Sequence, residues 1–160
     1  MSVEKVREYL KDYGKDGDIQ EFSESSATVE LAAVRLGVEP ARIAKSIAFY
    51  DRDKDNGILV VTAGDAKIAN GKFQQFFGQK AKMLKAEDVE ALTGHAVGGV
   101  CPFCNPAPLR IYADVSLQRF ASVFPACGSA NSAIEMTCDE LFTVSRAQDW
   151  VDVCKLPAIE

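Results

Sequence analysis

The chain has 160 residues, of which 48% are hydrophobic and 26% charged, and its formal net charge at pH 7 is −5. This length and composition predict a single globular domain over residues 1–160, with a sizeable hydrophobic core. The acidic balance excludes broad, non-specific adhesion to nucleic acid, which depends on neutralising many phosphates at once. The longest apolar run, residues 58–63, is far too short to span a bilayer, so we expect no membrane association.

The cellular compartment is predicted from the N-terminal sequence and the cysteines. Residues 1–5 lack the apolar segment of a secretory signal peptide. The chain has five cysteines, and an odd number in a chain of this size fits reduced thiols better than a disulfide framework. We therefore expect a cytoplasmic protein.

The sequence divides into short helices and short strands. Apolar residues at helical spacing predict helices near residues 3–13, 29–36, 73–77, 86–92, 116–120 and 139–143, with a further helical turn from Pro40. Ser26 or Thr28 can cap the second helix, and Gly37 stands where its left-handed C-terminal residue is expected. Runs of strand-forming residues predict strands near residues 19–22, 47–50, 58–62, 83–84, 97, 109–112 and 133–136. Because these elements mix without a regular β-α-β rhythm, the predicted fold class is α+β, or mixed α/β, around a single curved sheet.

The segment from Thr93 to Cys104 is the richest in residues that carry chemistry. It holds the only histidine of the chain, His95, the pair Gly98-Gly99 and a Cys-x-x-Cys formed by Cys101 and Cys104. A glycine has no Cβ, so its backbone amides can face a ligand directly. We therefore expect ligand contact or chemistry in this segment.

Lysines gather in a second segment, residues 67–85. Its five lysines are followed by no acidic residue until Glu87. A solvated helix face explains such a run, and a local positive surface for an anionic partner explains it as well.

Five short motifs, in this order, resemble the YbaK/ProX family of freestanding aminoacyl-tRNA deacylases, which are related to the editing domain inserted in bacterial prolyl-tRNA synthetases. The motifs are Ile43-Ala44-Lys45-Ser46-Ile47, Val61-Thr62-Ala63-Gly64-Asp65 with Lys67, Gly98-Gly99-Val100-Cys101-Pro102-Phe103, Tyr112-Ala113-Asp114 with Ser116-Leu117, and Ala126-Cys127-Gly128-Ser129. The resemblance covers most of the chain. It implies a mixed six- or seven-stranded sheet or pseudo-barrel with surrounding helices, and a pocket for the 3′ end of an aminoacylated tRNA.

The same resemblance assigns the catalytic role to Lys45. Its ammonium is expected at the start of an apolar strand, beside a partly desolvated cleft where a phosphate or an ester can pair with it. Burial lowers the pKa of a lysine and a nearby phosphate raises it again, so the sequence leaves the protonation state open.

Further pocket residues follow from the resemblance. The loop Gly98-Gly99-Val100-Cys101-Pro102 is expected to hold the aminoacyl carbonyl as charge develops on its oxygen, with Gly128-Ser129 as the facing wall. Ser46, Asp65 and Lys67 are expected to line the pocket. His95 is placed with these residues, and we expect it to support the loop by hydrogen bonding rather than to transfer a proton.

Two features depart from the family pattern. Most relatives lack the second cysteine, Cys104, which raises the alternatives of a zinc site or a redox dithiol. Zinc needs about four ligands and no second Cys-x-x-Cys is present, while a dithiol belongs at a helix start and Pro106 follows closely here. We therefore expect no metal ligands. Residues 131–133 also lack the acid of some cysteinyl-tRNA deacylases, which puts specificity for cysteine in doubt.

The sequence as a whole predicts an enzyme that acts in trans and removes a misattached cysteine, alanine or serine from tRNA, with tRNA(Pro) favoured. Water, or the thiol of a cysteine substrate, attacks the ester, so neither a protein nucleophile nor a cofactor is required. The expected partners are the 3′ end of the mischarged tRNA and prolyl-tRNA synthetase. Two alternatives stay open, a non-catalytic aminoacyl- or tRNA-binding accessory of a synthetase and a thiol oxidoreductase that uses Cys101 and Cys104.

Overall fold

A computed structural model gives the structure of the chain and describes residues 2–25, 28–52 and 55–157. In chain order, with η for 3₁₀ helices, the elements are α1 (Ser2–Lys11), η1 (Asp16–Asp18), β1 (Gln20–Glu21), α2 (Val29–Leu36), η2 (Pro40–Arg42), β2 (Ile43–Tyr50), β3 (Gly57–Ala63), β4 (Lys67–Ile68), α3 (Asn70–Phe77), α4 (Ala86–Thr93), β5 (Arg110–Asp114), η3 (Val115–Arg119), β6 (Ser122–Pro125), β7 (Ser132–Ala133), β8 (Met136–Thr137), α5 (Cys138–Ser145), β9 (Trp150–Val151) and β10 (Cys154–Lys155). Among the described residues no helix is both long and apolar enough to cross a membrane.

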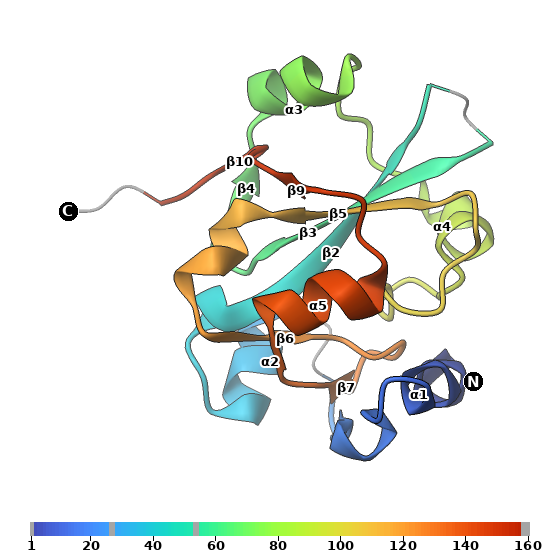
Figure 1. Ribbon diagram of the computed structural model, residues 1–160, viewed down its shortest axis with the longest axis vertical. Coiled ribbons are helices and arrows are strands. Elements are labelled where there is room, and N and C mark those ends of the chain that lie inside the picture. The colour runs from blue at the N-terminus through green and yellow to red at the C-terminus, as the bar shows by residue number, and fades with distance from the viewer. Residues whose placement is uncertain (1, 26–27, 53–54, 158–160) are drawn as a thin grey trace.

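The largest sheet has six strands in the order β8-β6-β2-β3-β5-β9 and curls into a half-barrel (Figure 1). β2 and β3 form a long antiparallel pair, whereas β2–β6, β3–β5 and β5–β9 are parallel. β1 pairs with β7, and β4 with β10, in two further antiparallel pairs. The mixed sheet with surrounding helices confirms the predicted α+β fold class.

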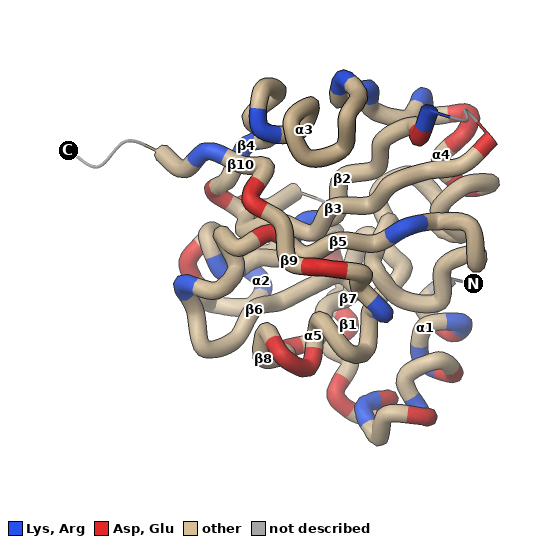
Figure 2. The backbone as a smooth tube through the Cα atoms, turned by 45° about the horizontal axis from the view of Figure 1, so that its top comes forward, with Lys and Arg blue, Asp and Glu red and all other residues tan. Residues whose placement is uncertain are grey.

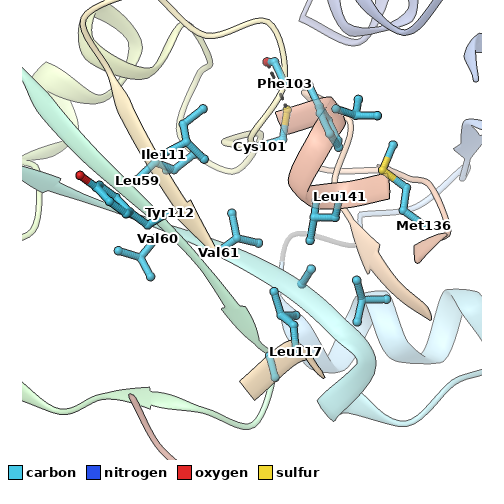
Figure 3. Packing of buried hydrophobic residues seen from close by; sticks show 14 of the residues in the cluster. Leu59, Val60, Val61, Cys101, Phe103, Ile111, Tyr112, Leu117, Met136 and Leu141 are labelled. Atoms are coloured by element: carbon cyan, nitrogen blue, oxygen red, sulfur yellow. Dashed lines mark hydrogen bonds between the residues drawn. The ribbon is translucent and has the colours of Figure 1, made fainter. Parts of the chain in front are cut away.

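The hydrophobic core lies against the central strand β3, whose seven residues are all buried. Its continuous apolar run, Ile58–Val61, is typical of a strand that is covered on both faces. Leu141 of α5 and Phe103 pack into the same core (Figure 3). Phe49 and Phe73 lie 4.7 Å apart between ring centroids, so α3 is anchored to β2 by aromatic packing.

Local capping signals predicted the second helix correctly. The Thr28 side chain accepts a hydrogen bond from Leu31 N–H at 3.1 Å, and Gly37 ends α2 in the left-handed conformation with φ of 69°. The other capping candidate, Ser26, lies outside the described residues. Pro40 begins η2, as predicted.

Several strand predictions were wrong. Residues near Val97 form an exposed turn, closed by the Gly99 N–H to Ala96 O bond, because the glycines that follow favour a turn. Met83 makes only an isolated bridge to Phe49. The predicted strand at 133–136 is divided between β7 and β8, which pair with different partners.

Candidate functional site

A cavity of about 260 Å³ lies between α2, the first half of β2, the loop at residues 98–100 and the segment from β6 to β7. We call it the Lys45 cavity. The residues that line it are Thr28, Val29, Ala32, Ile43, Ala44, Lys45, Ser46, Gly98, Val100, Phe124, Ala126, Ser129, Ser132 and Ala133. The sheet thus brings together Lys45, Ser46, Gly98, Val100 and Ser129, which the sequence predicted for one pocket. Lys45 is the sole charged side chain among these lining residues, and none of them is a carboxylate.

Lys45 is held at the wall of this cavity by backbone oxygens. Its Nζ donates to the carbonyl of Ala66 and lies 3.4 Å from the carbonyl of Gly64, in the turn that follows β3. Desolvation by burial lowers the pKa of this ammonium below its ordinary value. The fixed, partly dehydrated cation can pair strongly with an anion or with a developing negative charge.

The backbone of β2 is open next to Lys45. β6 covers the free edge of β2 at residues 43–44, and residues 82–84 cover it at Ala48 and Tyr50. The alternation of the ladder turns the peptide groups of even-numbered residues toward this edge. Ser46 therefore presents an N–H and a C=O that have no strand partner among the described residues, and both are available to a ligand.

The glycine loop is packed closely on the facing segment. A Cβ on Gly99 would lie 2.7 Å from the carbonyl oxygen of Gly128, so only glycine fits this contact. Gly98 has a φ of 89° and lies at the cavity wall. The Gly99 N–H is used inside the turn, whereas the N–H groups of Gly98 and Val100 make no backbone hydrogen bond to a described residue.

His95 and Cys101 lie beneath the loop and are fully buried, so neither reaches the Lys45 cavity. His95 Nε2 is 2.7 Å from the carbonyl oxygen of Phe103, and desolvation lowers its pKa. The Cys101 Sγ is 3.4 Å from the same nitrogen, and burial raises the pKa of this thiol to about 12. Pro102 is also buried. His95, Cys101 and Pro102 therefore support the glycine loop from the interior of the protein.

Asp65, Lys67 and Gly128 lie near the cavity without lining it. Asp65 forms an ion pair with Arg119, whose guanidinium hydrogen bond lowers the pKa of the carboxyl group. Lys67 faces a neighbouring cavity. Gly128 packs against Gly99.

Nine of the lining residues were not predicted as part of the pocket: Thr28, Val29, Ala32, Ile43, Ala44, Phe124, Ala126, Ser132 and Ala133. Ser132 Oγ lies 2.7 Å from Ser129 Oγ, so two hydroxyl groups share one wall. The neighbouring Asn131 instead ties this segment to the N-terminal region, since its Nδ2 donates to the carbonyl of Phe22 at 2.7 Å. The sequence did contain a signal for Ser132, because this hydroxyl residue comes shortly after the predicted pocket wall Gly128-Ser129.

The cysteines are not arranged for metal binding or dithiol chemistry. In the described part of the chain, no group of three or more His, Cys, Asp and Glu side chains is placed to hold a metal ion. Cys104 has a left-handed φ of 56° and does not begin a helix. A reactive dithiol requires a lowered pKa, and burial of Cys101 has the opposite effect.

Comparison with known proteins shows the class of protein to which this chain belongs. The aminoacyl-tRNA editing domain model matches residues 23–144. A crystal structure described as that of "a putative trans-editing enzyme for prolyl tRNA synthetase" superposes with a TM-score of 0.86 at 28% identity, over 96% of this chain and 97% of that one.

Two curated proteins are similar over most of their length. YwhH of Bacillus subtilis (strain 168) is 52% identical over 155 residues, which are 97% of this chain and 98% of YwhH. The "Putative Cys-tRNA(Pro)/Cys-tRNA(Cys) deacylase EbsC" of Enterococcus faecalis (strain ATCC 700802 / V583) is 25% identical over 79% of this chain and 77% of its own. The chain belongs to the aminoacyl-tRNA editing domain family, and it is an enzyme of the deacylase class.

Proposed function

We propose that this protein acts in trans as an aminoacyl-tRNA deacylase that releases a misattached small amino acid from tRNA(Pro). The observation that carries the proposal is the convergence of the Lys45 ammonium, the open Ser46 peptide and the glycine loop on one small cavity. The similarity to the deacylase EbsC and to the prolyl-tRNA synthetase trans-editing structure supports tRNA(Pro) as the carrier.

The cavity lining supports a small substrate side chain. Val29, Ala32, Phe124 and Ala133 leave a volume of about 260 Å³ with mostly apolar walls. This is below the about 300–1,000 Å³ of typical ligand pockets, which favours a small substrate side chain. Alanine, serine and cysteine are therefore the candidates, and the hydroxyl groups of Ser129 and Ser132 can accept hydrogen bonds from the substrate ammonium.

The reaction is the hydrolysis of an ester. Water, or a cysteine substrate's own thiol, attacks the carbonyl carbon, and the bond from that carbon to the ribose oxygen breaks, with a proton passing to the leaving oxygen. Lys45 and the N–H groups of Ser46, Gly98 and Val100 offset the negative charge that develops on the carbonyl oxygen. With a thiol nucleophile, a cyclic thioester forms first and water opens it.

No protein nucleophile is needed in this scheme. Of the five cysteines, none lines the Lys45 cavity. His95 lies outside the cavity too, so proton transfer by its imidazole is not part of the proposed reaction. The proposed protein partner is prolyl-tRNA synthetase, which would deliver the mischarged tRNA, and the proposed location is the cytoplasm, where translation takes place.

The test is a panel of purified tRNAs. tRNA(Pro) carrying alanine, serine, cysteine or proline, and the cognate pairs Ala-tRNA(Ala) and Cys-tRNA(Cys), are incubated with the wild-type protein, and the released amino acid is measured. We expect rapid release of at least one small amino acid from tRNA(Pro) and slow release of proline. Binding of these tRNAs without release would instead show a non-catalytic accessory, and equal release from every tRNA would contradict the proposed specificity.

A further inference from the structure

A second cavity lies on the other side of Lys45. Its volume is about 360 Å³, and we call it the Met83 cavity. Its apolar walls are formed by Ile47, Phe49, Ile68, Ala81 and Met83, and its polar lining residues are Lys45, Lys67 and Asn70. Of the residues that the structure describes, Lys45 alone lines both this cavity and the Lys45 cavity.

The position of Lys45 between the two cavities indicates where the tRNA part of the substrate lies. In an aminoacyl-tRNA, one carbonyl carbon joins the amino acid to the terminal ribose. If the amino acid occupies the Lys45 cavity and the ester lies at Lys45, the terminal nucleoside begins within a few bond lengths of Lys45. The Met83 cavity is the adjoining space that shares this residue.

The walls of the Met83 cavity suit a nucleobase. Met83 is 65% exposed although its side chain is large and apolar, and Ile47 and Ile68 are only half-buried. Flat apolar surface of this kind can stack on a base, and the unbranched thioether of methionine adapts to its partner. The Asn70 side chain makes no hydrogen bond to a described residue, so its amide is free to meet the edge of a base.

The charges beside this cavity suit a phosphate. Lys67 of β4 lies directly opposite Lys155 of β10, and two like charges opposite each other on an antiparallel pair repel. Neither lysine forms an ion pair within the described part of the chain. The nearby carboxylate of Asp65 is already engaged by Arg119, with 3.1 Å between Nη1 and Oδ2.

The positive surface continues past the cavity. Lys80, Lys82 and Lys85 follow α3 in sequence, and Lys and Arg residues gather along the edge that carries α3 and β4 (Figure 2). In a chain with a net charge of −5, this edge therefore carries several lysines, of which Lys45 and Lys67 line the apolar cavity. Such a combination of cations and stacking surface is what single-stranded nucleic acid requires.

We propose that the Met83 cavity is the subsite for the terminal nucleoside of the tRNA. The base stacks on Met83 and Ile47 and meets Asn70, and the phosphate on its 5′ side is bound by Lys67 and Lys155. This inference rests on the proposed function, because that function places the ester at Lys45.

The first experiment measures binding without catalysis. The trinucleotide CCA is titrated into the protein carrying ¹³C-labelled methyl groups. We expect the methyl signals of Ile47, Ile68, Ala81 and Met83 to shift, while those of Val29 and Ala32 stay in place because no amino acid is attached. Shifts confined to Val29 and Ala32, or no shift at millimolar trinucleotide, would overturn the proposal.

The second experiment measures steady-state kinetics. Met83→Glu places a negative charge at the base and Lys67→Glu places one at the phosphate, and each is expected to raise KM for the mischarged tRNA at least about tenfold. The matched controls are Val34→Glu, at another apolar residue that is 70% exposed, and Lys11→Glu on α1, which should leave KM unchanged. Equal effects in the variants and their controls would contradict a specific subsite.

The two proposals fail in different ways. If CCA shifts the methyl signals but no mischarged tRNA is hydrolysed, the proposed function is wrong and the nucleoside subsite stands. If mischarged tRNA is hydrolysed and Met83→Glu and Lys67→Glu leave KM unchanged, the deacylase stands and the subsite is wrong.

Discussion

Lys45 is the residue at which stability and function oppose each other. Its side chain is partly buried among backbone carbonyls, and burial lowers its pKa. The folded protein therefore holds this proton less tightly than the unfolded chain does. The stability contribution of Lys45 is complete at high pH and is lost as the pH falls through the folded pKa, so at neutral pH the ammonium costs stability.

We predict that Lys45→Met does not lower the free energy of unfolding at pH 7. Methionine keeps much of the length of the side chain and removes the dehydrated charge, although the carbonyls of Gly64 and Ala66 lose a donor. Urea denaturation of wild type and variant checks this. A loss of more than about 2 kcal/mol, the size typical of a core defect, would show that Lys45 is mainly structural.

His95 gives a second prediction, which concerns pH. Desolvation lowers its pKa below the usual value of about 6.5, so the unfolded chain takes up a proton at a higher pH than the folded protein. The stability provided by neutral His95 is therefore complete above about pH 6.5 and is lost as the pH falls toward the folded pKa. Between pH 7.5 and 5, denaturation curves of wild type should show a larger loss of stability than those of His95→Gln.

The rate of deacylation provides the complementary test for His95. The His95 ring is buried beneath the loop and hydrogen-bonded to the carbonyl oxygen of Phe103. The pH profile of the deacylation rate should therefore show no transition that disappears in His95→Gln. A transition near pH 6.5 that is lost in this variant would make His95 a general base.

At the scale of elements, the contact between the glycine loop and residues 126–130 holds one wall of the Lys45 cavity. We predict that Gly99→Ala lowers both deacylation and thermal stability, because its Cβ would meet the Gly128 backbone at 2.7 Å and neither backbone can yield cheaply. Gly14→Ala is the control for backbone strain alone, since φ is positive at Gly14, at 70°, but not at Gly99, and nothing lies within 4 Å of the Cβ added at Gly14.

The control separates steric clash from backbone strain. Gly14→Ala should cost about 1 kcal/mol of stability and leave activity unchanged. Gly99→Ala with full activity would show that the close packing of these two loops does not shape the cavity.

The elements that were predicted correctly are those that local signals define. Thr28 and Gly37 delimit α2 by capping, and the run Ile58–Val61 indicates a buried strand without reference to the remainder of the chain. β9 and β10 have two residues each and exist only because a partner strand lies beside them. β6 ends in Pro125, which lowers the local strand preference.

The same distinction between local and non-local signals applies to the candidate site. Lys45, Ser46 and the glycine loop belong to recognisable motifs, and the structure places Lys45, Ser46, Gly98 and Val100 on one cavity. Phe124 reaches this cavity because β6 pairs with β2 in parallel, a non-local contact that no sequence period encodes. Asp65 is directed away from it by Arg119, a partner 54 residues further along the chain.

At the scale of the whole molecule, an acidic protein must bind an acidic substrate. The net charge is −5, and one group of Lys and Arg residues lies near β4 and α3 (Figure 2). Binding that depends on three or four lysines releases few counterions, so the logarithm of affinity should fall with the logarithm of salt with a slope between about −2 and −3. Fluorescence anisotropy of labelled tRNA, measured over a salt range from about 50 to about 300 mM, gives this slope, and a slope steeper than about −6 would indicate a much wider interface.

One rate constant tests the assignment of Lys45 to the active site most directly. It is the single-turnover rate of deacylation of mischarged tRNA(Pro), measured with wild type, Lys45→Met and Lys11→Met at saturating enzyme. Loss of an electrostatic group that acts on the developing oxyanion should slow Lys45→Met by about 100-fold or more, while Lys11→Met, on the exposed face of α1, keeps the wild-type rate. A Lys45→Met protein that is folded and as fast as wild type would contradict the assignment of the active site.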